Sequence, residues 1–287
     1  MPRIPDSRLK TQLDLLYARY GAGFLDSDPI CFPRLFARPD DREVMAFLAT
    51  ALAYGRVPQI QASLRRLAGL VGPSPARFVR EFDPAEGGSL LHGFVHRFND
   101  ARDLGLLFYF MRQMFEQSGS LEGFFMEGYE PQSDDIEPSL GSFVRRALQL
   151  DSSPYYAGGR LPADAGVRFF LPSPEDGSTC KRMNLFLRWM VRRDDGVDFG
   201  QWRGVSPAQL IIPLDTHVSR ISASLGLTRR RTVNWMMARE VTARLRRLEP
   251  SDPVKYDFAL SRLGMLEGCP RHRATAPCEL CSLRRAS

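Results

Sequence analysis

The stretch 210–227, LIIPLDTHVSRISASLGL, predicts where one of the helices of this chain begins. An apolar approach ends at Pro213, and Asp215 then stands where a helix must begin, because Val218, Ile221 and Leu225 recur at the spacing of one helix face. Aspartate is a preferred N-cap, so Asp215 could serve only as a cap. The same position also holds a carboxylate beside backbone amides, where it can orient an amine or stabilise a developing cation. In either role we expect Asp215 to be buried and ordered.

A second informative stretch is 177–193, GSTCKRMNLFLRWMVRR. It predicts an apolar helix with Ser178 and Thr179 as candidate caps and with Lys181 near the N-terminal end. At the edge of a core, lost hydration and the positive helix end both favour the uncharged amine, which is the nucleophilic form. The alternative is that Lys181 only extends its ammonium group into water.

Lysine is scarce in the 287-residue chain, which has three lysines and 36 arginines. Only lysine can become an amine nucleophile, so each of the three is a candidate. Lys10 lies in an N-terminal amphipathic stretch and is expected at the surface. Lys255 follows Asp252 and Pro253, which predict a helix start and give that block a structural explanation. Lys181 has no such structural explanation in the sequence, and both readings of it, a nucleophile and a solvated surface lysine, stay open at this point.

Helical periodicity dominates, and neither alternating strands nor tight hairpins are indicated, so we expect an all-α fold. We predict two lobes: a discontinuous basic lobe from 1–40 and 215–287, and a central lobe from 41–214. An irregular acidic excursion is expected at about 127–178, where Pro, Gly, Ser and Asp are frequent. Helices are expected over 41–54, 58–70, 102–115, 140–150, 179–192, 215–225, 232–248 and 253–266.

Composition indicates a soluble globular protein, with 44% hydrophobic and 25% charged residues. These values exclude a disordered or collagen-like chain. No apolar run reaches the roughly 18 residues of a membrane span, and the N-terminus lacks the apolar core of a signal peptide. We therefore expect a cytoplasmic monomer that does not bind membranes.

Charge is concentrated near the C-terminus. From Thr216 to Ser287 there are fourteen Lys and Arg against six Asp and Glu, a net charge of +8, whereas the whole chain carries +6. The residues before Thr216 therefore sum to −2. Such a basic quarter favours a polyanionic partner, although many basic faces are only solvated.

The segment LDTHVSRI (214–221) resembles the V-D-T-H-V-x-R segment of the helix-hairpin-helix DNA glycosylases, the superfamily of endonuclease III. That resemblance implies that Asp215 is the catalytic carboxylate and Lys181 the nucleophile that attacks the sugar, expels a damaged base and forms a Schiff base. The two residues would face each other across the cleft between the lobes. The hairpin of the type L-P-G-V-G is replaced here by LPSPEDGST (171–179).

The 34-residue spacing of Lys181 and Asp215 is similar to that of the archaeal 8-oxoguanine glycosylases. The blocks CFPRLF, ALAYGRV, SPEDGSTCKRMNLFLRWMVR, IIPLDTHVSR and DPVKYDFAL look closer still to a bacterial family of conserved proteins of unknown function. The implied function is base-excision DNA repair: a glycosylase with β-lyase activity on an oxidised purine, bound to double-stranded DNA with a flipped base and associated with the nucleoid. The alternative is a non-catalytic nucleic-acid-binding protein on the same scaffold.

Several further residues are candidate DNA contacts. Tyr54, Arg56 and Gln59, in ALAYGRVPQIQ, could fill the space left by a flipped base or reach its partner, although a tyrosine that ends an apolar helix is more often part of the core. His217 and Arg220 could contact phosphate. The helical spacing of Phe186 and Trp189 favours core packing over base stacking.

The proposed chemistry requires no cofactor. The C-terminal segment nevertheless contains Cys269, His272, Cys278 and Cys281 at plausible zinc spacing. In endonuclease III relatives this location holds a four-cysteine iron–sulfur loop, whereas only three cysteines occur here. A zinc site, a degenerate iron–sulfur site and the absence of any metal all remain open.

Overall fold

The computed structural model describes residues 5–266 and is all-α, as the periodicity predicts. Its one sheet within these residues is a two-residue-per-strand hairpin, β1 (Val95–His96) and β2 (Asn99–Asp100), which the sequence did not indicate. The helices are α1 Asp6–Arg19, α2 Pro39–Ala51, α3 Val57–Val71, α4 Pro75–Glu81, α5 Pro84–Leu90, α6 Ala101–Ser118, α7 Leu121–Met126, α8 Glu137–Ala147, α9 Lys181–Val191, α10 Thr216–Ser224, α11 Trp235–Arg246 and α12 Asp257–Leu266. Short 3-10 turns, η1 to η6, occupy Ala22–Phe24, Pro29–Cys31, Pro33–Leu35, Gly166–Phe170, Pro174–Asp176 and Pro207–Gln209.

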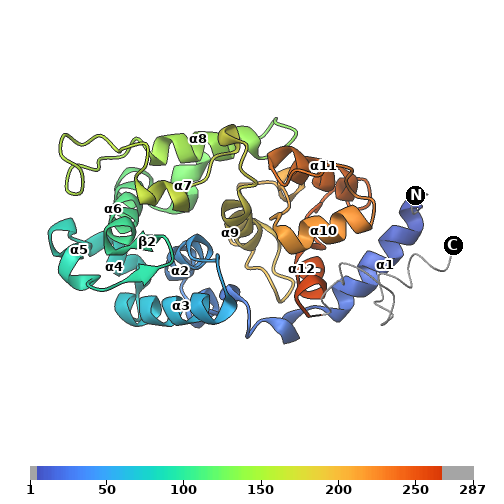
Figure 1. Ribbon diagram of the computed structural model, residues 1–287, viewed down its shortest axis with the longest axis horizontal. Helices are drawn as coiled ribbons and strands as arrows, with labels where there is room; N and C mark the ends of the chain where they lie inside the picture. Colours follow the sequence, from blue (N-terminus) through green and yellow to red (C-terminus); the bar gives the residue numbers. More distant parts are fainter. Residues whose placement is uncertain (1–4, 267–287) are drawn as a thin grey trace.

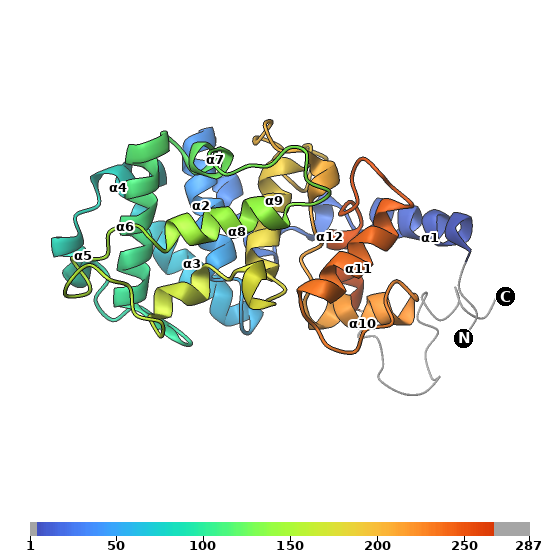
Figure 2. The same ribbon diagram turned by 90° about the horizontal axis from the view of Figure 1, so that it is seen from above.

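The helices gather at the two ends of an elongated molecule, with α9 between them (Figure 1). One group contains α2 to α8, in which α2 packs on α4 and α6 packs on α4, α5 and α7. The other contains α1, α10, α11 and α12, and α12 packs on both α1 and α10 (Figure 2). The division into lobes at residues 40 and 214 stays a prediction. As expected, the segment 127–178 is largely irregular around α8.

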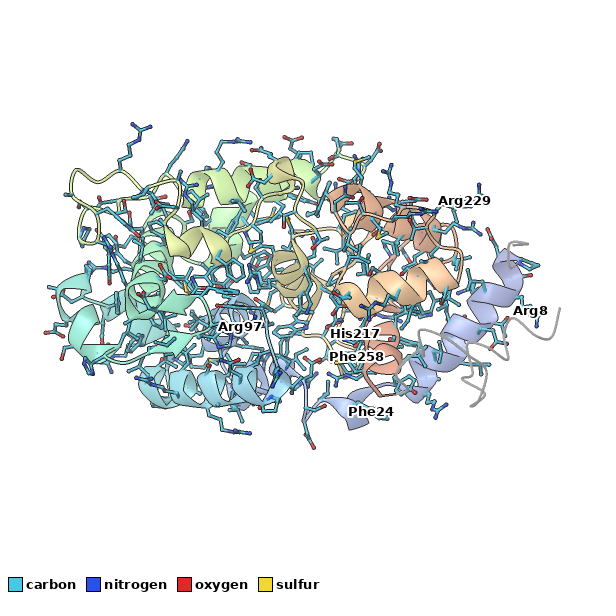
Figure 3. All side chains as sticks on the ribbon, viewed as in Figure 1. Arg8, Phe24, Arg97, His217, Arg229 and Phe258 are labelled. Carbon is cyan, nitrogen blue, oxygen red and sulfur yellow. The ribbon has the colours of Figure 1, made fainter. Side chains whose placement is uncertain are left out.

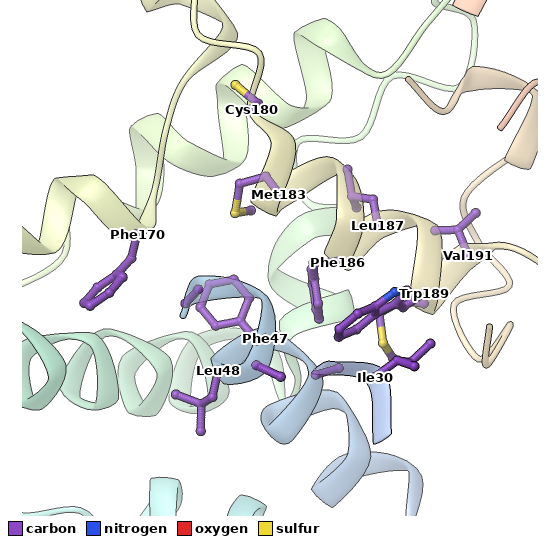
Figure 4. Close-up of a cluster of buried hydrophobic side chains, with 14 of the residues drawn as sticks. Ile30, Phe47, Leu48, Phe170, Cys180, Met183, Phe186, Leu187, Trp189 and Val191 are labelled. Carbon is purple, nitrogen blue, oxygen red and sulfur yellow. The ribbon is translucent and has the colours of Figure 1, made fainter. Parts of the chain in front are cut away.

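The core of the first group is completed by α9, which lies against α2 (Figure 4). The rings of Phe47 and Phe186 meet edge to face with centroids 5.1 Å apart, and Trp202 meets Phe186 edge to face with centroids 5.2 Å apart. Trp189 is fully buried and Phe186 nearly so. The prediction that these two residues belong to the core is confirmed. Burial of this apolar face fixes α9 and hence the direction of its N-terminal end.

Two arginines are buried here, Arg188 within α9 and Arg192 at its C-terminal cap. Arg188 donates to Asp198 over 3.1 Å and to Asp257 of α12 over 2.5 Å, and the side chains of all three are at most 3% exposed. Burial alone would lower the pKa of Arg188, but the surrounding carboxylates more than offset this and raise it. A buried charge is tolerated only when it is paired and hydrogen-bonded, so this contact specifies how α9 sits on α12.

One turn further along, Arg192 completes the buried network. Its guanidinium donates to Asp252 and Asp195, each over 3.0 Å, and also pairs with the fully buried Asp198. The expectation that Asp252 caps a helix beginning at Pro253 is therefore wrong, because α12 begins at Asp257. The Asp252 carboxylate instead accepts hydrogen bonds from Arg192. This contact outweighs the local preference of aspartate for capping a helix.

We expect Arg192→Met to lower the free energy of unfolding by about 3–5 kcal/mol, because it removes one of the two cations that pair with the buried Asp198 and takes the guanidinium away from Asp195. Arg77→Met, which breaks an exposed pair with Glu81, should cost less than about 1 kcal/mol. Urea unfolding followed by circular dichroism measures both. Equally small losses in the two variants would contradict a structural role for the network.

Candidate active site

Lys181 is the first residue of α9, close to the expected position. The residue that caps this helix is Cys180, in the left-handed conformation with φ 48°, and no side chain caps it. The prediction of Ser178 or Thr179 as the cap is therefore wrong. The Ser178 hydroxyl instead accepts from the Cys180 amide over 3.2 Å, and the Cys180 side chain is fully buried. The chain thus enters α9 through a tight turn that is anchored immediately before Lys181.

Asp215 is the N-cap of α10, as predicted, and its two oxygens have different roles. Oδ1 accepts from the amides of His217 and Val218 over 2.8 and 2.9 Å. Oδ2 lies 3.4 Å from Nζ of Lys181. Asp215 is therefore more than a cap: the capping bonds hold the carboxylate in place while one oxygen stays directed at the amine.

The Lys181–Asp215 pair is accessible from solvent, with 34% of the lysine side chain and 23% of the aspartate side chain exposed. The expectation that Asp215 would be buried is wrong; it is half-buried because α10 begins at the surface. Behind it lies Asp257, whose pKa burial raises to about 6, and the charge of Asp215 contributes to that increase. An accessible amine beside an oriented carboxylate can attack an electrophilic carbon and stabilise the cation that results.

The other two lysines have structural partners. Lys255 bonds Asp14 over 2.9 Å and lies 3.5 Å from Glu249, and Lys10 contacts Asp14 and Glu249, each over 3.2 Å. Burial opposes the charge of each ammonium, but the hydrogen bonds to these carboxylates prevail and raise the pKa of both lysines. The Lys10 side chain is 39% exposed, at the surface as expected, and it contacts Glu249 and the hydroxyl of Tyr256, which precede α12. Both lysines join α1 to the chain around α12.

The three candidate contacts after α2 differ in exposure. Arg56 and Gln59 are exposed, at the N-terminal end of α3. Tyr54 is half-buried: its hydroxyl donates to the His96 carbonyl and the Asn99 side chain over 2.8 and 2.6 Å. Burial raises the pKa of Tyr54 to about 12. Tyr54 is thus held in place by the hairpin that the sequence did not reveal.

The two candidates on α10 are both exposed. The Cβ of His217 packs against Gly264 of α12. A side chain at position 264 would bring its Cβ to 3.0 Å from the Cβ of His217. Arg220 lies one turn further along the same helix. In the view of Figure 3, Arg97 at the hairpin tip lies in the first group of helices, and His217 lies in the second group.

Family comparison adds one finding. Residues 28–266 match the model of a family described as "Protein of unknown function (DUF2400)". The chain belongs to this family. Comparison with curated proteins and with solved structures gives no significant match.

Sequence reasoning missed one set of residues around Arg182 of this DUF2400 protein. Arg182 follows Lys181 directly and lies 4.0 Å from the ring centroid of Phe169 and 5.1 Å from that of Tyr54. Phe98 stands at the tip of the β1–β2 hairpin and is 70% exposed. No local signal marks these residues, because the hairpin turn is Arg97-Phe98 rather than a glycine or asparagine pair.

The candidate metal ligands Cys269, His272, Cys278 and Cys281 lie outside the described residues of the DUF2400 protein. Within residues 5–266, His, Cys, Asp and Glu side chains form no group that could hold a metal ion. In the same part of the chain, no helix is long and apolar enough to cross a membrane. The zinc and iron–sulfur alternatives therefore stay predictions.

The two roles of Asp215 can be separated by substitution. Asparagine caps a helix as well as aspartate does, so Asp215→Asn should change the free energy of unfolding by less than about 1 kcal/mol. Asp215→Ala removes the cap and should cost about 0.5–2 kcal/mol. Thermal unfolding of the two variants beside the wild type measures the difference. Equal stability of the alanine and asparagine variants would contradict the capping bonds.

Proposed function

We propose that the protein is a base-excision DNA glycosylase with β-lyase activity, in which Lys181 is the nucleophile and Asp215 the catalytic carboxylate. The observation that carries this proposal is the 3.4 Å separation of Nζ and Oδ2 at the adjacent starts of α9 and α10. The likeness of LDTHVSRI to the helix-hairpin-helix glycosylases supports the same two roles. An arginine at position 181 could not form the covalent intermediate.

The proposed reaction begins with a base turned out of the duplex, so that C1′ of its sugar is exposed. The uncharged Lys181 amine forms a bond to C1′ as the C1′–N bond to the base breaks, and the base leaves with the electron pair and takes up a proton. Asp215 stabilises the positive charge that develops on the sugar. Loss of a proton from the lysine nitrogen and opening of the sugar ring give the Schiff base. Loss of a proton from C2′ then expels the 3′ phosphate and cuts the strand.

Two exposed arginines favour a polyanionic partner. Arg56 and Arg220 are exposed and take part in no ion pair within the described residues, so their guanidiniums can contact phosphates. His217, exposed on α10 next to Asp215, adds a further donor. We propose double-stranded DNA as the partner and an oxidised purine, 8-oxoguanine first, as the substrate by likeness to the archaeal enzymes.

Borohydride trapping tests the chemistry directly. The wild-type protein should form a covalent adduct with duplexes that contain 8-oxoguanine opposite each of the four bases, and with a duplex that contains an abasic site. Lys181→Gln should form none, because a carboxamide cannot make an imine. Asp215→Asn should slow trapping by about 100-fold or more. Denaturing gels measure the adduct.

Lys10→Gln is the matched control, since it removes a lysine charge far from the pair and should leave trapping unchanged. The abasic duplex separates a wrong lesion from a wrong mechanism, because its sugar needs no base removal. An absence of adduct on abasic DNA, or full trapping by Lys181→Gln, would overturn the proposal. In the first case, salt-sensitive binding of DNA unaffected by Lys181→Gln would establish the non-catalytic alternative.

A further inference from the structure

A group of aromatic side chains, two of them exposed, packs around Arg182, the residue that follows Lys181, and the chemistry proposed above does not use it. We call Tyr54, Phe98 and Phe169, with the guanidiniums of Arg97 and Arg182, the aromatic surface. Phe98 is 70% exposed and Phe169 is 40% exposed. Phe98 comes from the β1–β2 hairpin, Phe169 from η4 and Tyr54 from the segment between α2 and α3, so three distant segments converge here.

The rings present one continuous face. Tyr54 and Phe98 are parallel to within 6° with centroids 6.4 Å apart, and Phe169 meets them edge to face at 4.7 and 5.9 Å. The guanidinium of Arg97 lies 5.0 Å from the Phe98 centroid. The side chain of Arg97 passes so close to Gly55 that a Cβ there would come within 2.8 Å of its Cδ. The glycine therefore makes room for the arginine that accompanies Phe98.

Exposure of Phe98 does not come from a loosely held hairpin. His96 and Asn99, at the base of the hairpin, are almost fully buried. The His96 ring bonds the Ser63 hydroxyl over 2.8 Å and the Tyr54 carbonyl over 3.1 Å. Asn99 donates to the Asp103 carboxylate and the Gly166 carbonyl over 2.9 and 2.8 Å. The aromatic surface is thus fixed before any ligand arrives, which lowers the entropic cost of binding.

Charge selects the kind of ligand. Within residues 5–266, Arg97 and Arg182 form no ion pair, and burial lowers the pKa of Arg182 only to about 10, so it stays charged at neutral pH. One of its terminal nitrogens is buried without a partner, and the other donates to the Phe169 carbonyl. A methylated ammonium ligand would be repelled by these two cations. A flat base linked to a phosphate suits both the rings and the guanidiniums.

We propose that the aromatic surface binds an unpaired nucleobase by stacking, with Phe98 and Phe169 as its main contacts. This inference rests on the proposed function and adds a recognition element to it: DNA that already contains an unstacked base next to the reacting sugar. Arg182 connects the two, because it follows Lys181 in α9 and lies over Tyr54 and Phe169. Since every base has a π-face, recognition should be nearly independent of base identity.

Binding to 2-aminopurine oligonucleotides tests the proposal without any chemistry. The full-length protein should bind a single strand, or a duplex with a bulged 2-aminopurine, more tightly than a fully paired duplex and should quench the probe. Phe98→Ala and Phe169→Ala should each weaken binding about tenfold and reduce the quenching. Phe98→Trp should restore both, which a merely structural role would not explain.

Two exposed apolar residues outside the aromatic surface serve as matched controls. Val95→Ala lies on the same hairpin at 64% exposure, and Leu35→Ala lies on η3 at 70% exposure. Neither change should alter binding. Unchanged binding by Phe98→Ala, or no rescue by Phe98→Trp, would overturn the stacking proposal while borohydride trapping by the wild type still supports the glycosylase. A wild-type protein that binds none of the probes would overturn both.

Discussion

The ion pair between Arg188 and Asp257 is the contact on which the geometry of the site depends. It joins α9 to α12 inside the protein, where each charge needs a partner, and Asp198 also pairs with Arg188. Because α12 also packs against α10, the same contact sets α9 relative to α10. Lys181 and Asp215 stand at the N-terminal ends of these two helices, so their separation follows from packing some two turns away.

Arg188 therefore explains why the apolar face of α9 alone is insufficient. Burial of Phe186 and Trp189 against α2 attaches α9 to one group of helices, and hydrophobic packing has little directional preference. The buried guanidiniums attach α9 to the other group with defined hydrogen-bond directions. α9 thus connects both groups and presents its first residue between them.

Local signals predicted the parts of the site that depend on local chemistry. Asp215 could be placed because capping involves only its next three residues. The arginine network could not be predicted, because the partners of Arg188 and Arg192 in α12 and before it are 69 and 60 residues away. A contact between residues far apart in sequence also explains why the helix expected at Pro253 begins at Asp257. Asp252 accepts a hydrogen bond from Arg192 instead of capping the helix. The aromatic surface was missed because its hairpin has two-residue strands and no glycine turn.

Scarcity of lysine makes the central claim unusually simple to examine. Lys10 and Lys255 are each engaged by carboxylates around α12, whereas Lys181 has an accessible amine and one carboxylate partner. The most direct test is peptide mapping by mass spectrometry of the borohydride-reduced complex with abasic DNA. The account predicts the sugar remnant on Lys181. A remnant on Lys10, Lys255 or the N-terminal amine would contradict it.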